Sequence, residues 1–114
     1  MEKFVRGSVV VIPFPFSDLS ATKRRPALVL ANLADNDILL CQITSQYKET
    51  KHVVPLEATD FTIGSLPVNS YIRPERIFTA DKSIILKTVG LVSGEILNKT
   101  VENIINILTD YHIC

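Results

Sequence analysis

The sequence contains little cysteine and has no long apolar run. Its two cysteines are Cys41, inside an apolar stretch, and Cys114, the last residue, so they form neither a zinc-ligand spacing nor a disulfide framework. No stretch reaches the roughly 18 continuous apolar residues of a membrane span, and the first residues lead into no signal-peptide core. We therefore expect a cytoplasmic protein with no metal site, no cofactor and no membrane partner.

The chain also lacks a net charge, because 12 lysines and arginines are matched by 12 acidic residues. This balance argues against a protein that coats nucleic acid non-specifically. Positive charge is instead local, at residues 23–25 and again at Arg73 and Arg76, whereas the segment from Ser93 onward carries three acidic residues and one lysine. A small basic site on a neutral body is compatible with an enzyme that touches only a few phosphates of a nucleic acid.

The 114 residues show no internal repeat, linker or low-complexity tract, which predicts a single domain spanning residues 1–114. Short β-branched runs between turn residues predict strands, whereas 58–69 is predicted to be a loop. The predicted strands cover residues 8–12, 26–31, 38–44, 53–56, 70–73, 77–79 and 87–92, with a bend at 74–75. The fold class predicted is mainly β, a small bent sheet or barrel of about five to seven antiparallel strands.

From Ser93 the hydrophobic period changes to that of a helix, and Ser93 itself is a suitable N-cap. We expect one C-terminal amphipathic helix that covers one side of the sheet. The residues predicted to form its apolar face are Leu97, Val101, Ile104, Ile105 and Leu108.

Three consecutive cations, residues 23–25, run into Pro26 and the apolar stretch 27–30. A proline at the first position of a strand biases the preceding Arg25 toward an extended conformation. A guanidinium held in this way suits bidentate recognition of phosphate or carboxylate. The alternative is a solubilising turn between two strands, and these residues taken alone favour that alternative.

Four segments occur in an order and spacing that resemble the PemK/MazF toxins of bacterial type II toxin–antitoxin systems. They are residues 6–10 (RGSVV), 25–30 (RPALVL), 42–45 (QITS) and 79–82 (TADK). The resemblance spans nearly the whole chain. It implies an SH3-like barrel, a homodimer, and a sequence-specific, metal-independent endoribonuclease that cleaves single-stranded RNA and is neutralised by a cognate antitoxin protein.

The same resemblance assigns site residues. Arg25 matches the arginine before proline that contacts the scissile phosphate, Thr44 matches the hydroxyl residue at the end of the third strand, and Glu75 and Arg73 match an acidic residue and an arginine before the T-x-D motif. These four are the predicted catalytic residues. The predicted RNA-binding residues are Phe16, Lys23, Arg24, Ser45 and Arg76.

Metal-independent cleavage of RNA requires deprotonation of the 2′-hydroxyl, stabilisation of the phosphorane and charge neutralisation on the departing 5′-oxygen. We expect Glu75 to take the proton, Arg25 to hold the non-bridging oxygens and Thr44 to donate a hydrogen bond to the phosphate. Arginine stays protonated in proteins, so Arg73 is assigned an electrostatic role. The alternative for Glu75 is a surface salt bridge with Arg73 or Arg76.

The chain departs from the family pattern in the 14–24 loop, which has no histidine, and at Ser8 and Phe78, where an acidic residue and an arginine are usual. A histidine-assisted mechanism is therefore not expected. Two other functions remain open at this point. One is a CcdB-like toxin that poisons DNA gyrase through its terminal helix without catalysis, and the other is a non-catalytic SH3-like binding module.

Overall fold

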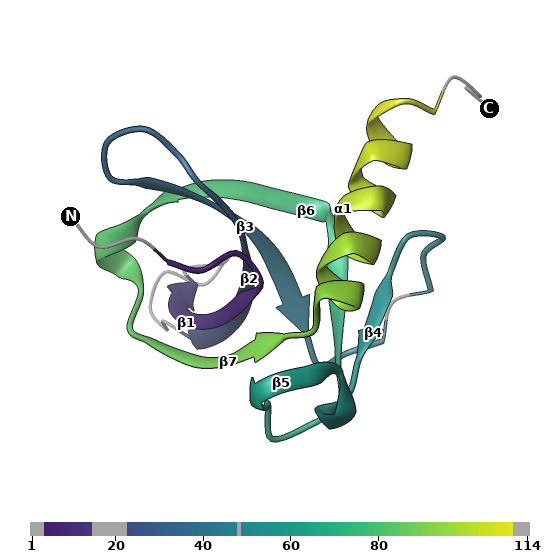
Figure 1. Ribbon diagram of the computed structural model, residues 1–114, viewed down its shortest axis with the longest axis horizontal. Helices are drawn as coiled ribbons and strands as arrows, with labels where there is room; N and C mark the ends of the chain where they lie inside the picture. The colour runs from purple at the N-terminus through teal and green to yellow at the C-terminus, as the bar shows by residue number, and fades with distance from the viewer. Residues whose placement is uncertain (1–3, 15–22, 48, 111–114) are drawn as a thin grey trace.

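In the computed structural model, which describes residues 4–14, 23–47 and 49–110, the strands form one antiparallel sheet and a helix follows them. The strand order in the sheet is β4-β6-β3-β2-β1-β7-β5 (Figure 1). The elements are β1 (Ser8–Phe14), β2 (Lys23–Asn32), β3 (Asp37–Thr44), β4 (Val54–Leu56), β5 (Phe61–Gly64), β6 (Ser70–Asp81), β7 (Lys87–Val92) and α1 (Gly94–Leu108).

The sheet curls into a partial barrel with α1 against one side (Figure 1). Register shifts interrupt the ladders between Val9 and Val10 of β1, between Val29 and Ala31 of β2, and on β3 before Ile43. Each such bulge kinks a strand and increases its twist. The predicted mainly β class, with five to seven antiparallel strands and a C-terminal helix, is confirmed.

The central strands are buried on both faces of the sheet. Leu28 and Leu30 of β2 belong to one core cluster, and the alternating Ala27 and Val29 belong to another. The first cluster packs against α1, and the second lies under apolar residues of β6 and of the segment that follows it. Burial on both sides explains why these strands read as continuous apolar runs in the sequence.

The bend predicted at residues 74–75 is a wide bulge within β6. On the β3 side, Ile43 pairs with Ile72 and Cys41 pairs with Ile77, so Gln42 alone faces the four residues 73–76. The chain therefore leaves the ladder between residues 73 and 76 and then rejoins it. This bulge carries three of the predicted site residues.

The prediction that Pro26 begins the second strand was wrong, because β2 begins at Lys23. Arg24 and Arg25 already pair with Pro13 and Ile12 of β1. Pairing of β2 with β3 starts only at Ala27, the residue after Pro26. The missing N–H of the proline therefore removes no hydrogen bond between these two strands.

The segment 58–69 was predicted to be a loop, and this was wrong for residues 58–64. A 3-10 turn, Ala58–Asp60, leads into β5, which pairs with β7 and forms an edge of the sheet. Gly64 and Gly90 face each other in this pair, and a Cβ on Gly64 would lie 2.1 Å from the carbonyl oxygen of Val89. The close approach requires glycine at this position. Because glycine weakens a strand, its presence in the sequence argued against predicting one here.

The helix begins as predicted, because the Ser93 hydroxyl accepts a hydrogen bond from the N–H of Ile96 at 3.3 Å. Thr100 is fully buried against the sheet and donates to the Ile96 carbonyl. The predicted apolar face was wrong at its end: Ile105 is 52% exposed and Leu108 is 73% exposed. Figure 1 shows that the last turns of α1 run past the sheet. Within the described residues, no helix is long and apolar enough to cross a membrane.

Candidate active site

Two of the predicted catalytic residues lie on one face of the sheet. Thr44 at the end of β3 pairs with Tyr71 of β6. The β2–β3 register joins Ala27 to Gln42. Continued by two residues along both strands, this register sets Arg25 opposite Thr44. Because cross-strand partners share a face of the sheet, Arg25, Thr44 and Tyr71 form one row across three strands.

Arg73 lies in the neighbouring row on the same face. Arg73 follows Tyr71 by two residues on β6, so alternation along the strand puts it on the face of Tyr71, at the start of the bulge. The thiol of Cys41 donates a hydrogen bond of 3.1 Å to the carbonyl oxygen of Arg73. This contact fixes the backbone at the point where the bulge of β6 begins.

The two arginines share an unusual feature. The Nε atoms of Arg25 and Arg73 are both buried, and neither has a hydrogen-bond partner among the described residues. A buried donor without a partner costs about 1–3 kcal/mol. Two such donors, both on cations and on one face, suit an anion with several acceptor oxygens, and a phosphodiester is such an anion.

The hydroxyl of Thr44 can accept one hydrogen bond within the fold and donate another to a ligand. Its oxygen accepts a hydrogen bond of 3.1 Å from the N–H of Gln46, which holds the turn that follows β3. A hydroxyl that accepts in this way still has its own hydrogen to donate. Thr44 can therefore end the strand and donate to a phosphate oxygen beside Arg25.

Glu75 is exposed on the bulge, as the predicted bend required. No ion pair joins it to Arg73, Arg76 or any other described residue, so the alternative of a surface salt bridge is not formed there. Burial and, to a smaller extent, the negative charge of Glu75 raise the pKa of the Cys41 thiol to about 12. Glu75 lies on the same bulge as Arg73, whose carbonyl oxygen accepts the hydrogen bond from the Cys41 thiol.

Two of the predicted RNA-binding residues come together with Arg25. Arg24 and Ser45 line, with Arg25, a pocket of about 190 Å³ between the start of β2, the end of β3 and the segment before β6. Arg24 and Ser45 themselves are exposed. The pocket thus joins residues that are far apart in the sequence to the predicted phosphate ligand.

The other predicted RNA-binding residues are not placed together by the structure. Lys23 is exposed at the start of β2, and Arg76 is exposed on the bulge of β6. Neither lines the pocket beside Arg25. Phe16 lies outside the described residues.

A pair of aromatic rings, which the predicted site does not include, lies beside Thr44. The rings of Tyr47 and Tyr71 meet edge to face, with centroids 5.3 Å apart, and Tyr47 is 60% exposed. An exposed aromatic ring of this kind can stack on an unpaired base. The available signal was alternation, because Tyr71 precedes Arg73 by two residues and so shares its face.

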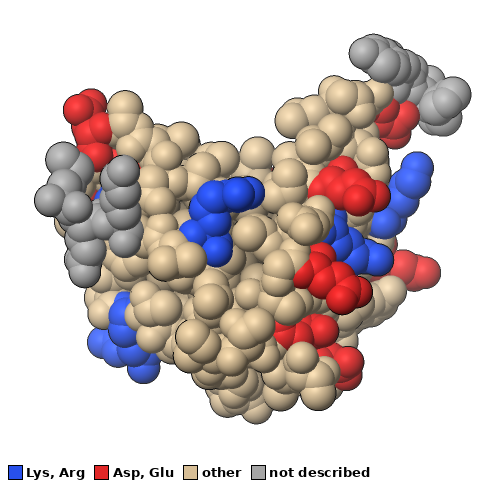
Figure 2. All heavy atoms as spheres, in the orientation of Figure 1, with Lys and Arg blue, Asp and Glu red and all other residues tan. Residues whose placement is uncertain are grey.

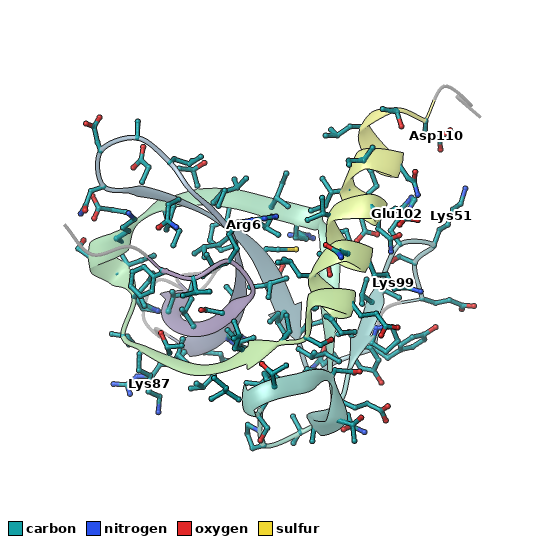
Figure 3. All side chains as sticks on the ribbon, in the orientation of Figure 1. Arg6, Lys51, Lys87, Lys99, Glu102 and Asp110 are labelled. Carbon is teal, nitrogen blue, oxygen red and sulfur yellow. The ribbon has the colours of Figure 1, made fainter. Side chains whose placement is uncertain are left out.

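Charged side chains are spread unevenly over the face drawn in Figure 2. Acidic side chains gather on the side that carries α1, where Figure 3 labels Glu102 and Asp110, and Lys51 and Lys99 lie on the same side. Arg6, also labelled in Figure 3, donates through Nε to the carbonyl oxygen of Leu30 at 2.8 Å. The Nε of Arg6 therefore has a partner, unlike the Nε atoms of Arg25 and Arg73 among the described residues.

The described residues include no group of three or more histidine, cysteine or acidic side chains that could hold a metal ion. The donor set beside Arg25 consists of guanidinium, hydroxyl and amide groups. Hydrogen bonding to an anion is the chemistry that this set supports.

The chain also matches a known protein family over most of its length. The model of the PemK-like, MazF-like toxins of type II toxin–antitoxin systems matches residues 5–108. The chain belongs to this family. The predicted resemblance to PemK/MazF toxins is thereby confirmed. No curated protein matches the chain.

Several solved structures share the PemK/MazF fold with this chain. A mycobacterial endoribonuclease in complex with its cognate antitoxin has a TM-score of 0.75 at 17% identity, covering 97% of this chain and 100% of its own. Another mycobacterial endoribonuclease has a TM-score of 0.73 at 20% identity, covering 99% and 98%. MazF from Deinococcus radiodurans has a TM-score of 0.70 at 23% identity, covering 90% and 93%. At these identities the likeness shows the fold.

Proposed function

We propose that this PemK/MazF-family toxin is a sequence-specific endoribonuclease that cleaves single-stranded RNA without a metal ion. The observation that carries the proposal is the pair of buried, unpartnered Nε donors of Arg25 and Arg73 on the face that also holds Thr44. The site offers charged donors to an anion, and no described residue accepts a hydrogen bond from these two Nε atoms. Similar folds in proteins described as endoribonucleases support the same activity.

In the proposed reaction the 2′-oxygen of the RNA attacks the adjacent phosphorus and the bond to the 5′-oxygen breaks. The 2′-proton passes to the carboxylate of Glu75, which is exposed and unpaired within the described residues. Arg25 and Thr44 bind the non-bridging oxygens, on which charge develops. Arg73 stabilises the departing 5′-oxygen, which takes its proton from water. The products are a 2′,3′-cyclic phosphate and a 5′-hydroxyl.

The proposal includes partners. The toxin works in the cytoplasm as a homodimer, and a cognate antitoxin neutralises it. Arg24 and Arg76 are exposed cations near the site, so an acidic antitoxin tail would compete there with RNA. Charge reversal of both residues should weaken binding of antitoxin and of RNA in parallel. Unchanged antitoxin affinity would contradict this part of the proposal.

The activity is tested by incubating the purified protein with a long transcript in the presence of EDTA. We expect discrete fragments from the wild-type protein, none from Arg25→Ala, and wild-type cleavage from Arg6→Ala, which removes an arginine that is paired away from the site. Intact RNA in the wild-type reaction would overturn the proposal. Inhibition of DNA gyrase by the same preparation would then favour the gyrase-poisoning alternative.

A further inference from the structure

The bulge of β6 carries Arg73 and Glu75, and a side chain that the proposed reaction does not use holds the start of this bulge. The thiol of Cys41 donates a hydrogen bond of 3.1 Å to the carbonyl oxygen of Arg73. We propose that Cys41 is a positioning residue, whose hydrogen bond sets the places of Arg73 and Glu75 in the active site. This inference rests on the proposed function and adds to it a residue that has no contact with RNA, because Cys41 is fully buried.

The neighbouring strands do not fix the bulge by pairing. On one side, the described pairs of β3 with β6 pass from the pair of Ile43 and Ile72 directly to the pair of Cys41 and Ile77. On the other side, β4 pairs only with residues 70–72 of β6. No described strand pair therefore includes residues 73–76, and a bulge leaves its extra residues without ladder partners. The position of this segment thus depends on contacts outside the ladder, of which the Cys41 thiol supplies one.

Arg73 is held by its neighbour in the sequence as well as by Cys41. Pro74 follows it and is buried, and a proline biases the residue before it toward an extended conformation. Pro74 thus restricts the backbone dihedrals of Arg73, whereas the hydrogen bond from Cys41 ties its carbonyl oxygen to β3. Glu75 is two residues further along the chain, so a displacement of the Arg73 carbonyl also moves the carboxylate that takes the 2′-proton in the proposed reaction.

Cys41 is suited to act as a fixed donor. Its side chain belongs to the core cluster that packs against α1 and is closed off from water. Burial and, to a smaller extent, the charge of Glu75 raise the pKa of the thiol to about 12, so the thiol keeps its proton at neutral pH. A thiol is only a weak donor, and the effect that we assign to it is the placement of the Arg73 carbonyl. Because side chains alternate along β3, Cys41 lies on the face opposite Thr44 and links the core to the site.

The proposed roles of Arg73 and Glu75 determine which kinetic constant should change. Arg73 stabilises the departing oxygen and Glu75 takes the proton, so both act in the transition state. Loss of an interaction made only in the transition state lowers kcat and leaves KM unchanged. A misplacement of about 1 Å can cost about 10²-fold in rate. Loss of the hydrogen bond from Cys41 should therefore lower kcat without weakening RNA binding.

The first test measures kcat and KM in EDTA for an RNA with a single cleavage site. Cys41→Val fills the buried position without a donor, and Cys41→Ser keeps a donor there. We expect Cys41→Val to lower kcat by at least about tenfold with KM within about twofold of wild type, and Cys41→Ser to retain most of kcat. Wild-type kcat in Cys41→Val, or an equal loss in Cys41→Ser, would overturn the inference.

The matched control is Val92→Ala, which perturbs the same core cluster at a different strand. Val92 is 4% exposed and lies on β7, which three strands separate from β6 in the sheet. We expect Val92→Ala to be less stable than wild type in urea denaturation and to keep the wild-type kcat. A loss of kcat in Val92→Ala as large as that in Cys41→Val would overturn the inference, because any change in the core would then lower the activity.

The second test does not require cleavage. Backbone amide relaxation of Glu75 and Arg76 is measured by NMR in the free protein and converted to order parameters. We expect values of about 0.85, as in rigid backbone, for wild type and Cys41→Ser, and values below about 0.6 for Cys41→Val. Unchanged order parameters in Cys41→Val would overturn the inference, even if the wild-type protein cleaves RNA. Lower values in Cys41→Val, beside a wild-type protein that leaves RNA intact, would reject the proposed function and keep Cys41 as the anchor of the bulge.

Discussion

Replacing Arg25 with methionine should abolish most of the activity without destabilising the protein. The Nε atom of Arg25 is buried and has no hydrogen-bond partner among the described residues. Replacing the side chain therefore removes no hydrogen bond between Nε and a described residue. An unsatisfied buried donor costs about 1–3 kcal/mol, and methionine retains much of the apolar stem without that donor. We therefore expect the free energy of unfolding of Arg25→Met to stay within about 1 kcal/mol of wild type, or to rise.

The activity of the same variant should fall steeply. Loss of one preorganised donor to a developing oxyanion typically lowers kcat by about 10²–10³, and Arg25→Met also loses the positive charge. The matched control is Arg6→Met, which removes the 2.8 Å bond from Nε to the Leu30 carbonyl. That variant should lose about 1 kcal/mol of stability and keep its cleavage rate.

The two quantities are measured on the same preparations, stability by urea denaturation and activity by the initial rate of cleavage of a labelled transcript. Arg73→Met should behave like Arg25→Met, because the Nε of Arg73 is also buried and without a hydrogen-bond partner among the described residues. The reasoning is refuted if Arg25→Met loses more than about 2 kcal/mol of stability, since the arginine would then be structural. It is equally refuted if Arg25→Met cleaves at the wild-type rate.

Three further outcomes follow from the remaining contacts. Ser93→Ala removes the N-cap of α1 and should cost about 1 kcal/mol in urea denaturation without changing the cleavage rate; an unchanged midpoint would show that the cap is not formed. Hydrogen bonds from Ser83 hold the pKa of Asp81 below its ordinary value of 3.8. Ionised Asp81 therefore stabilises the protein at pH values above its pKa in the unfolded chain, and this stability is lost as pH falls through its pKa in the folded protein. Asp81→Asn should be less stable than wild type at neutral pH and equally stable at strongly acid pH, as compared by thermal denaturation. With its pKa raised to about 12 by burial, the Cys41 thiol should not react with a thiol reagent at pH 7.5 in a Cys114→Ser background until the protein is unfolded, and rapid labelling of the native protein would contradict the burial.

Much of the fold could be predicted from the sequence because the core strands are continuous apolar runs. The β-branched run of β1 and the apolar runs of β2 and β3 are buried on both faces, so they stand out without any alternation. The Ser93 cap and the change of period marked the start of α1. The far end of α1 was predicted less well, because whether Ile105 and Leu108 are covered depends on where the sheet ends.

β5 was missed for a tertiary reason. Its pairing with β7 depends on two glycines that face each other, and Gly64 has a φ of +66°, so local propensity argues against a strand there. The early start of β2 at Lys23 is similar, since its polar first residues are ordered by pairing with β1. Neither partner is visible in a local window of sequence.

The candidate site was predicted as a set of residues, and its geometry could not be predicted. The order of the motifs singled out Arg25, Thr44, Arg73 and Glu75, and the structure places the first three on one face. The unpaired state of the two Nε atoms depends on how the surrounding side chains pack. The pocket depends on the return of residues 65–69 beside Ser45, which no local pattern reports.

The chemistry of the RNA ends tests the central claim most directly. The wild-type protein is incubated with a defined single-stranded RNA in EDTA, and the fragment ends are identified by mass spectrometry. The proposed attack of the 2′-oxygen beside Arg25 predicts a 2′,3′-cyclic phosphate and a 5′-hydroxyl, both absent with Arg25→Met. Fragments that carry a 3′-hydroxyl and a 5′-phosphate, or the same fragments from Arg25→Met, would contradict the account.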